Sequence, residues 1–226
     1  MQTSTKNFYE KIDLERLLKG KSYLLLNEQS ILFWHEKEES YVVGKIEQDK
    51  RYTAADYAQL PENAPYQLIN YHLVYMPAPF NVHQEVSGEI NFLIKTHLKK
   101  QHLGGKLFYA PADVHFDEGN IYQPDIFYVS EERKSIVTNK YTYGAPDFIV
   151  EILSESTANQ DYEEKMKVYG KFSVLEYWIV DIEKAKIEVY YNVNGEMKLA
   201  QKAEKQDKIL SKAIAGFELN LTDIFN

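Results

Sequence analysis

The order of the helical and β-type patterns constrains the fold of this chain most strongly. From His83 to Leu103, apolar residues recur every three or four positions, which predicts a long helix that ends at Gly104 and Gly105. β-type segments, a second helical pattern and further β-type segments follow in the order 106–116, 122–129, 147–153, 161–172, 177–181 and 187–192. This order predicts a mixed β-sheet with helices packed against its faces, an α/β or α+β architecture.

The first 50 residues differ from the rest of the chain and predict a small extension. They contain an amphipathic stretch, Phe8 to Leu18, and three β-type runs at 23–26, 31–34 and 41–43. Such short elements favour an appended hairpin and helix over an independent domain. We therefore expect an N-terminal extension over residues 1–50 and one larger domain over residues 51–226. In that domain Thr53 is a candidate N-cap for a short helix, 54–60, and residues 66–76 predict one or two strands.

Charge and composition exclude several classes of protein. The chain has 26 Lys and Arg against 34 Asp and Glu, a net charge of −8, which argues against a purely electrostatic nucleic-acid binder but not against a local basic groove. The absence of cysteine excludes disulfides, a thiol nucleophile and thiolate metal sites. The sequence shows neither a membrane-spanning apolar run nor a signal-peptide pattern, so we expect no membrane association and a cytoplasmic protein.

Two carboxylates in apolar surroundings are the main candidates for chemistry. Asp125, in one of two Pro-Asp pairs, lies in the apolar segment 121–129, and Glu151 is the acid of the segment 148–153. A buried charge is costly unless a partner or a metal compensates it. A divalent cation would compensate both acids, and carboxylate oxygens suit Mg²⁺ or Mn²⁺. The alternative is that each acid pairs with Lys or Arg, although arginine occurs only at positions 16, 51 and 133.

Lys165 is a candidate for the same site, but its spacing also fits a structural role. It follows Asp161 by four residues, so an exposed Lys165 would pair with Asp161 along its own helix. Lys165 can serve both roles only if the helix packs this edge toward the ends of the strands. The spacing alone leaves both roles open.

Four blocks occur in a characteristic order: Gln123-Pro-Asp125, Gly144–Ser154, Glu164–Tyr169 and Glu176–Asp181. In these blocks the chain resembles the Uma-type putative restriction endonuclease family, part of the PD-(D/E)XK nuclease superfamily. The resemblance extends from about Tyr52 to Phe225 and leaves the first 50 residues outside. It implies a restriction-endonuclease-like core, a mixed sheet flanked by helices, with a metal-dependent phosphodiesterase site.

The resemblance also implies a role for each candidate residue. Asp125 and Glu151 match the acids that hold Mg²⁺ (or Mn²⁺), together with the carbonyl of Ile152. The superfamily lysine would fall at Leu153, and Lys165 matches the helix lysine that replaces it in this family. Lys165 would then orient the attacking water or stabilise the charge that develops on the phosphate. The implied function is Mg²⁺-dependent endonuclease action on DNA, and a homodimer is expected by analogy.

One departure from the family supports a second hypothesis. Gln67, Asn70 and His72 stand where the family has acids, so the chain could be a catalytically weakened nuclease-fold protein that serves as a nucleic-acid-binding or regulatory module. Otherwise these are surface hairpin positions that vary freely. A carboxylate-pair glycosidase fits poorly, because Asp125 and Glu151 lie in apolar segments rather than at an open cleft.

Three further features have both a structural and a functional interpretation. His83 begins the long helix, where we expect capping or packing rather than catalysis. The basic stretch 95–102 with Lys106 could follow a phosphate backbone, but complementing the helix dipole is favoured. Tyr162, Met166 and Tyr169 are expected in the core rather than as a base-stacking surface.

Overall fold

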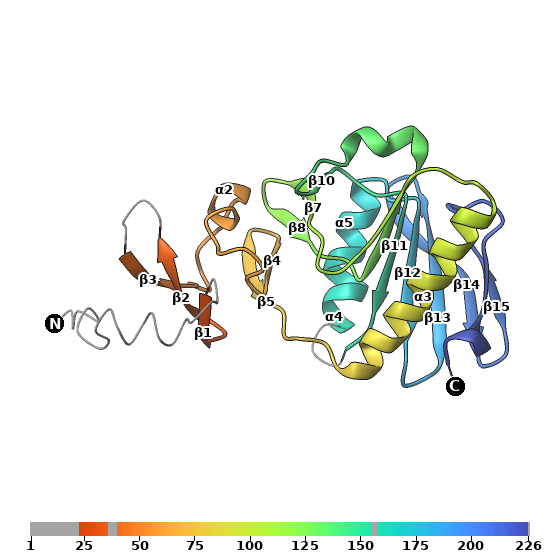
Figure 1. The fold of residues 1–226 in the computed structure, drawn as a ribbon, viewed down its shortest axis with the longest axis horizontal. Helices are drawn as coiled ribbons and strands as arrows, with labels where there is room; N and C mark the ends of the chain where they lie inside the picture. The colour runs from red at the N-terminus through yellow and green to blue at the C-terminus, as the bar shows by residue number, and fades with distance from the viewer. Residues whose placement is uncertain (1–22, 36–39, 155–157, 226) are drawn as a thin grey trace.

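The computed structural model describes residues 23–35, 40–154 and 158–225. Their strands form four sheets of three, five, six and two strands, and the two long helical segments pack on the six-stranded sheet (Figure 1). The predicted amphipathic stretch Phe8 to Leu18 lies outside the described residues. The described part of the chain contains no helix that is both long and apolar enough to cross a bilayer.

The N-terminal strands form a small antiparallel sheet, which confirms the three predicted β-type runs. Its order is β1 (Tyr23–Asn27), β2 (Ser30–His35) and β3 (Ser40–Lys45). Ile31 of this sheet is fully buried in a cluster with Tyr66 of the next sheet, and the Tyr66 hydroxyl donates to the Glu28 carbonyl at 3.2 Å. The N-terminal sheet therefore packs on the sheet that contains Tyr66.

The five-stranded sheet contains the hairpin that carries Gln67, Asn70 and His72. Its order is β10 (Thr142–Tyr143), β7 (Val114–Asp117), β8 (Asn120–Tyr122), β4 (Tyr66–Ile69) and β5 (His72–Tyr75). Asn70 and Tyr71 join β4 to β5 with φ values of 49° and 68°, the left-handed geometry of a two-residue hairpin turn. Before this sheet, Thr53 and Asp56 form the capping box of α2 (Ala54–Tyr57), which confirms the predicted N-cap although the helix is shorter than predicted.

The six-stranded sheet is mixed, as the sequence order predicts. It runs β14 (Glu196–Glu204), β13 (Lys186–Val193), β12 (Glu176–Asp181), β11 (Phe148–Ile152), β9 (Ile126–Val129) and β6 (Lys106–Tyr109). The pair β11 and β12 is parallel, and the other neighbours are antiparallel. A parallel pair needs a crossover connection, which here is the second helical segment.

Helices cover both faces of this sheet, so β11 is buried on each side. α3 (Asn81–Lys100) covers one face through residues that include Val86, Ile90 and Ile94, in a cluster with Val150. The crossover covers the other face and consists of α4 (Ala158–Gln160), the π-helical turn η3 (Asp161–Lys165) and α5 (Met166–Lys171). Because strand side chains alternate, Glu151 lies on the crossover face of β11 with Ile149.

Two predicted strands are each divided in the structure. The segment 106–116 forms β6 and β7, and the segment 122–129 is interrupted at Gln123, Pro124 and Asp125, between β8 and β9. Proline cannot donate a ladder hydrogen bond, which accounts for the interruption. Asp125 therefore lies immediately before β9 and not inside a strand, which corrects the sequence-based placement.

The C-terminal part contains strands that the sequence patterns did not predict. They are β14, β15 (Lys208–Leu210) and β16 (Glu218–Asn220). Two 3-10 helices complete the described elements: η2 (Glu131–Ile136) follows β9, and η4 (Leu221–Asp223) follows β16. β14 is the exposed edge of its sheet and carries alternating charges, so it lacks a clear apolar period. Glu176 of β12 holds the C-terminal segment, since its buried carboxylate accepts from the backbone N–H groups of Lys212 and Ala213.

Candidate active site

The strand register brings Asp125 and Glu151 to neighbouring positions. Val150 of β11 pairs with Ile126 of β9, so the next step of the same antiparallel register places Asp125 opposite Glu151. Residues that oppose each other in such a pair share one face of the sheet. The backbone N–H of Ile152 donates to Asp125 Oδ2 at 2.7 Å, which ties Asp125 to β11 beyond the last ladder pair.

Lys165 lies in the same cluster and is completely buried. Its Nζ is 3.0 Å from Glu151 Oε1 and 2.8 Å from Asp161 Oδ1, and the Lys165 side chain is 2% exposed. Lys165 therefore contacts both Asp161 on its own helical segment and Glu151 on β11. The expectation that Lys165 is exposed is wrong. The π-helical turn supplies both Asp161 and Lys165, and such turns are frequent at functional sites.

The cluster has more negative than positive charge. Asp125, Glu151 and Asp161 surround one ammonium, that of Lys165. Burial raises the pKa of Glu151 to about 8 against the effect of Lys165, and the Asp161 and Asp125 carboxylates act in the same direction as burial. Burial alone would lower the pKa of Lys165, but Asp161 and Glu151 raise it, so this side chain stays charged. When Glu151 is ionised, three carboxylates face one ammonium, so a cation that binds here would favour the ionised form of Glu151 against burial.

Tyr169 contributes to the site from inside the core. Its ring is fully buried and packs edge-on against Tyr177, as the core prediction for Tyr169 requires. Its hydroxyl donates to Glu151 Oε1 at 2.6 Å. Asp161, Lys165 and Tyr169 follow each other at intervals of four residues, and this spacing could have placed all three on one helical face.

His83 also reaches the site, from the opposite layer. Its Nε2 is 3.3 Å from Asp125 Oδ2 and 3.2 Å from the carbonyl oxygen of Ile152. Burial alone would lower the pKa of His83, but the Asp125 carboxylate outweighs burial and raises it. The N-terminus of α3 has no side-chain cap hydrogen bond, so of the two expected roles of His83 capping is wrong, whereas its burial agrees with packing. No sequence spacing linked His83 to Asp125, because the contact joins segments 42 positions apart.

The two arginines among the described residues do not neutralise Asp125 or Glu151. Arg133 binds Asp147, the acid of the second Pro-Asp pair, at 3.0 Å, and Arg51 stacks on the Tyr71 ring at 4.0 Å. The ion-pair alternative therefore holds for Glu151, which pairs with Lys165, whereas Arg133 pairs with Asp147. Asp125 instead contacts the Ile152 N–H and His83.

Gln67, Asn70 and His72 of the β4–β5 hairpin occupy different environments. Asn70 and His72 are exposed, which confirms them as surface positions, whereas Gln67 is buried at 3% exposure, so the surface interpretation is wrong for Gln67. Its Oε1 has no hydrogen-bond partner among the described residues. Alternation along β4 places Gln67 on the face of Ile69, which packs in the same core cluster as Tyr169.

The basic stretch lies at the other end of α3. Lys99 follows His83 by 16 residues, which is about 24 Å along a helix. Its neighbourhood is therefore remote from the carboxylates, and His97, Lys99 and Lys100 occupy the last turn. This position fits the predicted complement to the helix dipole.

The donor set fits a divalent cation bound only in part by protein. Among the described residues, no group of three or more His, Cys, Asp or Glu is arranged to hold a metal ion. The described contacts of Asp125 fall on Oδ2 and those of Glu151 on Oε1, which leaves Oδ1 and Oε2 as donors. Mg²⁺ is commonly held by one or two carboxylates and completes its shell with water and phosphate oxygens.

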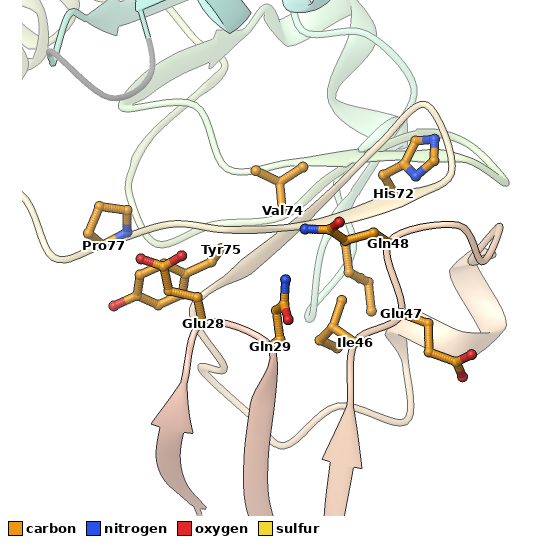
Figure 2. A pocket seen from close by; sticks show the side chains of 10 residues that line it. Glu28, Gln29, Ile46, Glu47, Gln48, His72, Val74, Tyr75 and Pro77 are labelled. Carbon is orange, nitrogen blue, oxygen red and sulfur yellow. The ribbon is translucent and has the colours of Figure 1, made fainter.

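A cavity lies apart from these residues, between the N-terminal sheet and strand β5. It has a volume of about 480 Å³. Figure 2 shows Glu28, Gln29 and Ile46 at the ends of the N-terminal strands, with Val74 of β5 opposite. Asp125, Glu151 and Lys165 are not part of its lining.

Comparison with known proteins supplies the family. The model of the Uma2 family, described as "Putative restriction endonuclease", matches residues 54–222, about three quarters of the chain. The chain belongs to the Uma2 family. The match contains all the site residues described above and excludes the N-terminal sheet.

A solved structure shows the same fold for the Uma2 core. The chain is similar to a putative nuclease belonging to DUF820 from Anabaena variabilis ATCC 29413, with a TM-score of 0.64 and 19% sequence identity. The similarity covers 76% of this chain and 97% of the other. A search of curated proteins finds no match. The family and the fold together confirm the predicted restriction-endonuclease-like architecture.

Proposed function

We propose that this protein is a Mg²⁺-dependent endonuclease that hydrolyses phosphodiester bonds in DNA. The observation that carries the proposal is the meeting of Asp125 and Glu151 across β9 and β11, with Lys165 buried between Glu151 and Asp161. The excess of negative charge in this cluster supports a cation as its natural partner. The Uma2 membership supports nuclease chemistry for this chain.

Each side chain has a separate task in the proposed reaction. Asp125 and Glu151 hold the cation, which when bound polarises the phosphate and lowers the pKa of a water molecule. Lys165 orients the attacking water or stabilises the negative charge that develops on phosphorus oxygens. The water oxygen forms a bond to phosphorus and releases a proton to solvent, the bond to the leaving oxygen breaks, and that oxygen takes up a proton from solvent. Asp161 keeps the Lys165 ammonium in place throughout.

Gln67 favours the second candidate function, a weakened nuclease that binds or regulates. It is a buried amide at a position where the family has an acid, and its Oε1 lacks a partner among the described residues. An acid there would add a ligand for a second cation. Without it, the protein would bind DNA with one cation and turn over slowly.

A cleavage assay tests the proposal directly. The full chain is incubated with supercoiled plasmid, linear duplex, single-stranded DNA and RNA, in Mg²⁺, in Mn²⁺ and in excess EDTA. We expect cleavage of DNA that needs the cation, that Asp125→Asn abolishes and that Glu183→Gln, an exposed change outside the cluster, retains. DNA binding without cleavage in either cation would establish the second candidate. Cleavage in EDTA that Asp125→Asn leaves unchanged would refute the proposed site.

Truncation tests the proposed boundary near residue 50. A chain that begins at Gln48 lacks Glu28, Gln29, Ile46 and Glu47 of the cavity but keeps the carboxylate cluster. We expect its metal affinity to be unchanged. Its free energy of unfolding should fall by about 1.5–3 kcal/mol, because Tyr66 loses its packing against Ile31 of the N-terminal sheet. Calorimetric titration of metal and urea unfolding measure the two effects. A folded truncated chain without metal affinity would show that the extension belongs to the functional site.

A further inference from the structure

We propose that His83 is a positioning residue that holds Asp125 and the Ile152 carbonyl in the arrangement that binds the cation. This inference rests on the proposed function, since it assigns a role at the same site. The geometry comes from two contacts of a single nitrogen, Nε2, with oxygens on two different segments.

The two contacts determine which nitrogen of the His83 imidazole carries a hydrogen. The Ile152 carbonyl, 3.2 Å from Nε2, is an acceptor, and so is the Asp125 carboxylate oxygen at 3.3 Å. Nε2 therefore carries the hydrogen and shares it between both oxygens. The other nitrogen, Nδ1, is buried and makes no hydrogen bond with the described residues. The polar contacts of the imidazole with these residues are therefore made by Nε2.

Asp125 needs this second restraint because its backbone is irregular. It lies in the break between β8 and β9, where its side chain is 17% exposed, and the described contacts of its carboxylate are the Ile152 N–H and His83. Both contacts fall on Oδ2 and direct Oδ1 away from them. His83 is itself 11% exposed and fixed in the first turn of α3. The long helix thereby sets the rotamer of a side chain on the opposite edge of the site.

The Ile152 carbonyl is part of the same restraint. The N–H of Ile152 binds Asp125, and its C=O binds His83, so this one peptide segment is held on both polar groups at the end of β11. Groups that orient metal ligands from outside the coordination shell typically change metal affinity about 10–100-fold when removed. That magnitude is the expectation for the loss of the Nε2 donor.

Side-chain length distinguishes this role from packing. The amide nitrogen of glutamine can replace Nε2 as a donor, whereas asparagine ends near the position of Nδ1 and leucine has no donor. We expect His83→Asn and His83→Leu to weaken Mn²⁺ affinity about 10–100-fold, and His83→Gln to retain most of it. Mn²⁺ binding is measured by electron paramagnetic resonance on the full chain, with melting in EDTA to confirm that each variant is folded.

The same helix provides a matched control. His97 Nε2 binds the Ala215 carbonyl at 2.9 Å, the same kind of contact, but at the far end of α3. His97→Asn should leave Mn²⁺ affinity unchanged. Equal affinity in wild type and all three His83 variants would overturn the inference while the metal site stands, and a His83→Gln as weak as His83→Asn would overturn the donor role. A wild-type chain that binds no Mn²⁺ would instead refute the proposed function itself.

Discussion

Glu151→Gln is expected to abolish both DNA cleavage and the stabilisation of the protein by Mg²⁺. The amide keeps the volume of the side chain and can still accept from Tyr169, but it is neutral and a poor ligand for Mg²⁺. A ligand at a hundred times its Kd stabilises the folded state by about 2.7 kcal/mol, and the variant should lose this whole increment. Thermal melts of wild type and variant, with and without Mg²⁺, measure it.

The stability of the metal-free protein gives this experiment its control. Removing one partner of a lone buried ion pair costs about 3–5 kcal/mol, because the other charge is stranded. In Glu151→Gln, Lys165 keeps its contact with Asp161 at 2.8 Å. The neutral side chain at position 151 is also no longer repelled by the Asp161 and Asp125 carboxylates. We therefore expect only a small change in EDTA. A large loss of stability in EDTA, together with a wild type that does not respond to Mg²⁺, would show that Glu151 serves the ion pair alone.

Lys165→Met is expected to have the largest effect on stability. Lys165 is the ammonium of the buried cluster, and methionine leaves Glu151 and Asp161 without it. The free energy of unfolding in EDTA should fall by about 3–5 kcal/mol, measured by urea denaturation. Mg²⁺ should restore part of this loss, since a cation compensates the same carboxylates.

Two further variants serve as controls for the loss of stability in Lys165→Met. Lys171→Met, on the same helical segment, changes a lysine that is 68% exposed and 3.7 Å from Asp117, so it should cost less than about 1 kcal/mol. The double variant Asp161→Asn with Lys165→Met should be more stable than Lys165→Met alone, because it removes the repulsion between the Asp161 and Glu151 carboxylates. If Lys165→Met and Lys171→Met were equally stable, the buried charge cluster would not exist in solution.

Local chemistry was enough to predict much of the framework. The period of α3, the Thr53 cap and the alternating strands follow from side-chain spacing within one segment, and each is confirmed. Segments with weak local signals were missed, such as β14, whose exposed edge mixes charged and apolar residues without a clear period. The break before Asp125 was also missed, although Pro124 was the local reason for it.

The site shows the same division between local and non-local information. A charge in an apolar segment demands a partner, so the sequence alone identified Asp125, Glu151 and the need for compensation. Which groups supply the compensation depends on how β9, β11 and the crossover meet, and only the tertiary structure decided it. Lys165 is buried rather than exposed because the π-helical turn packs on the Glu151 face, and His83 reaches Asp125 because α3 begins at the end of the sheet. Contacts between segments tens of residues apart leave no period in the chain, since spacing encodes only neighbours on one helix or strand.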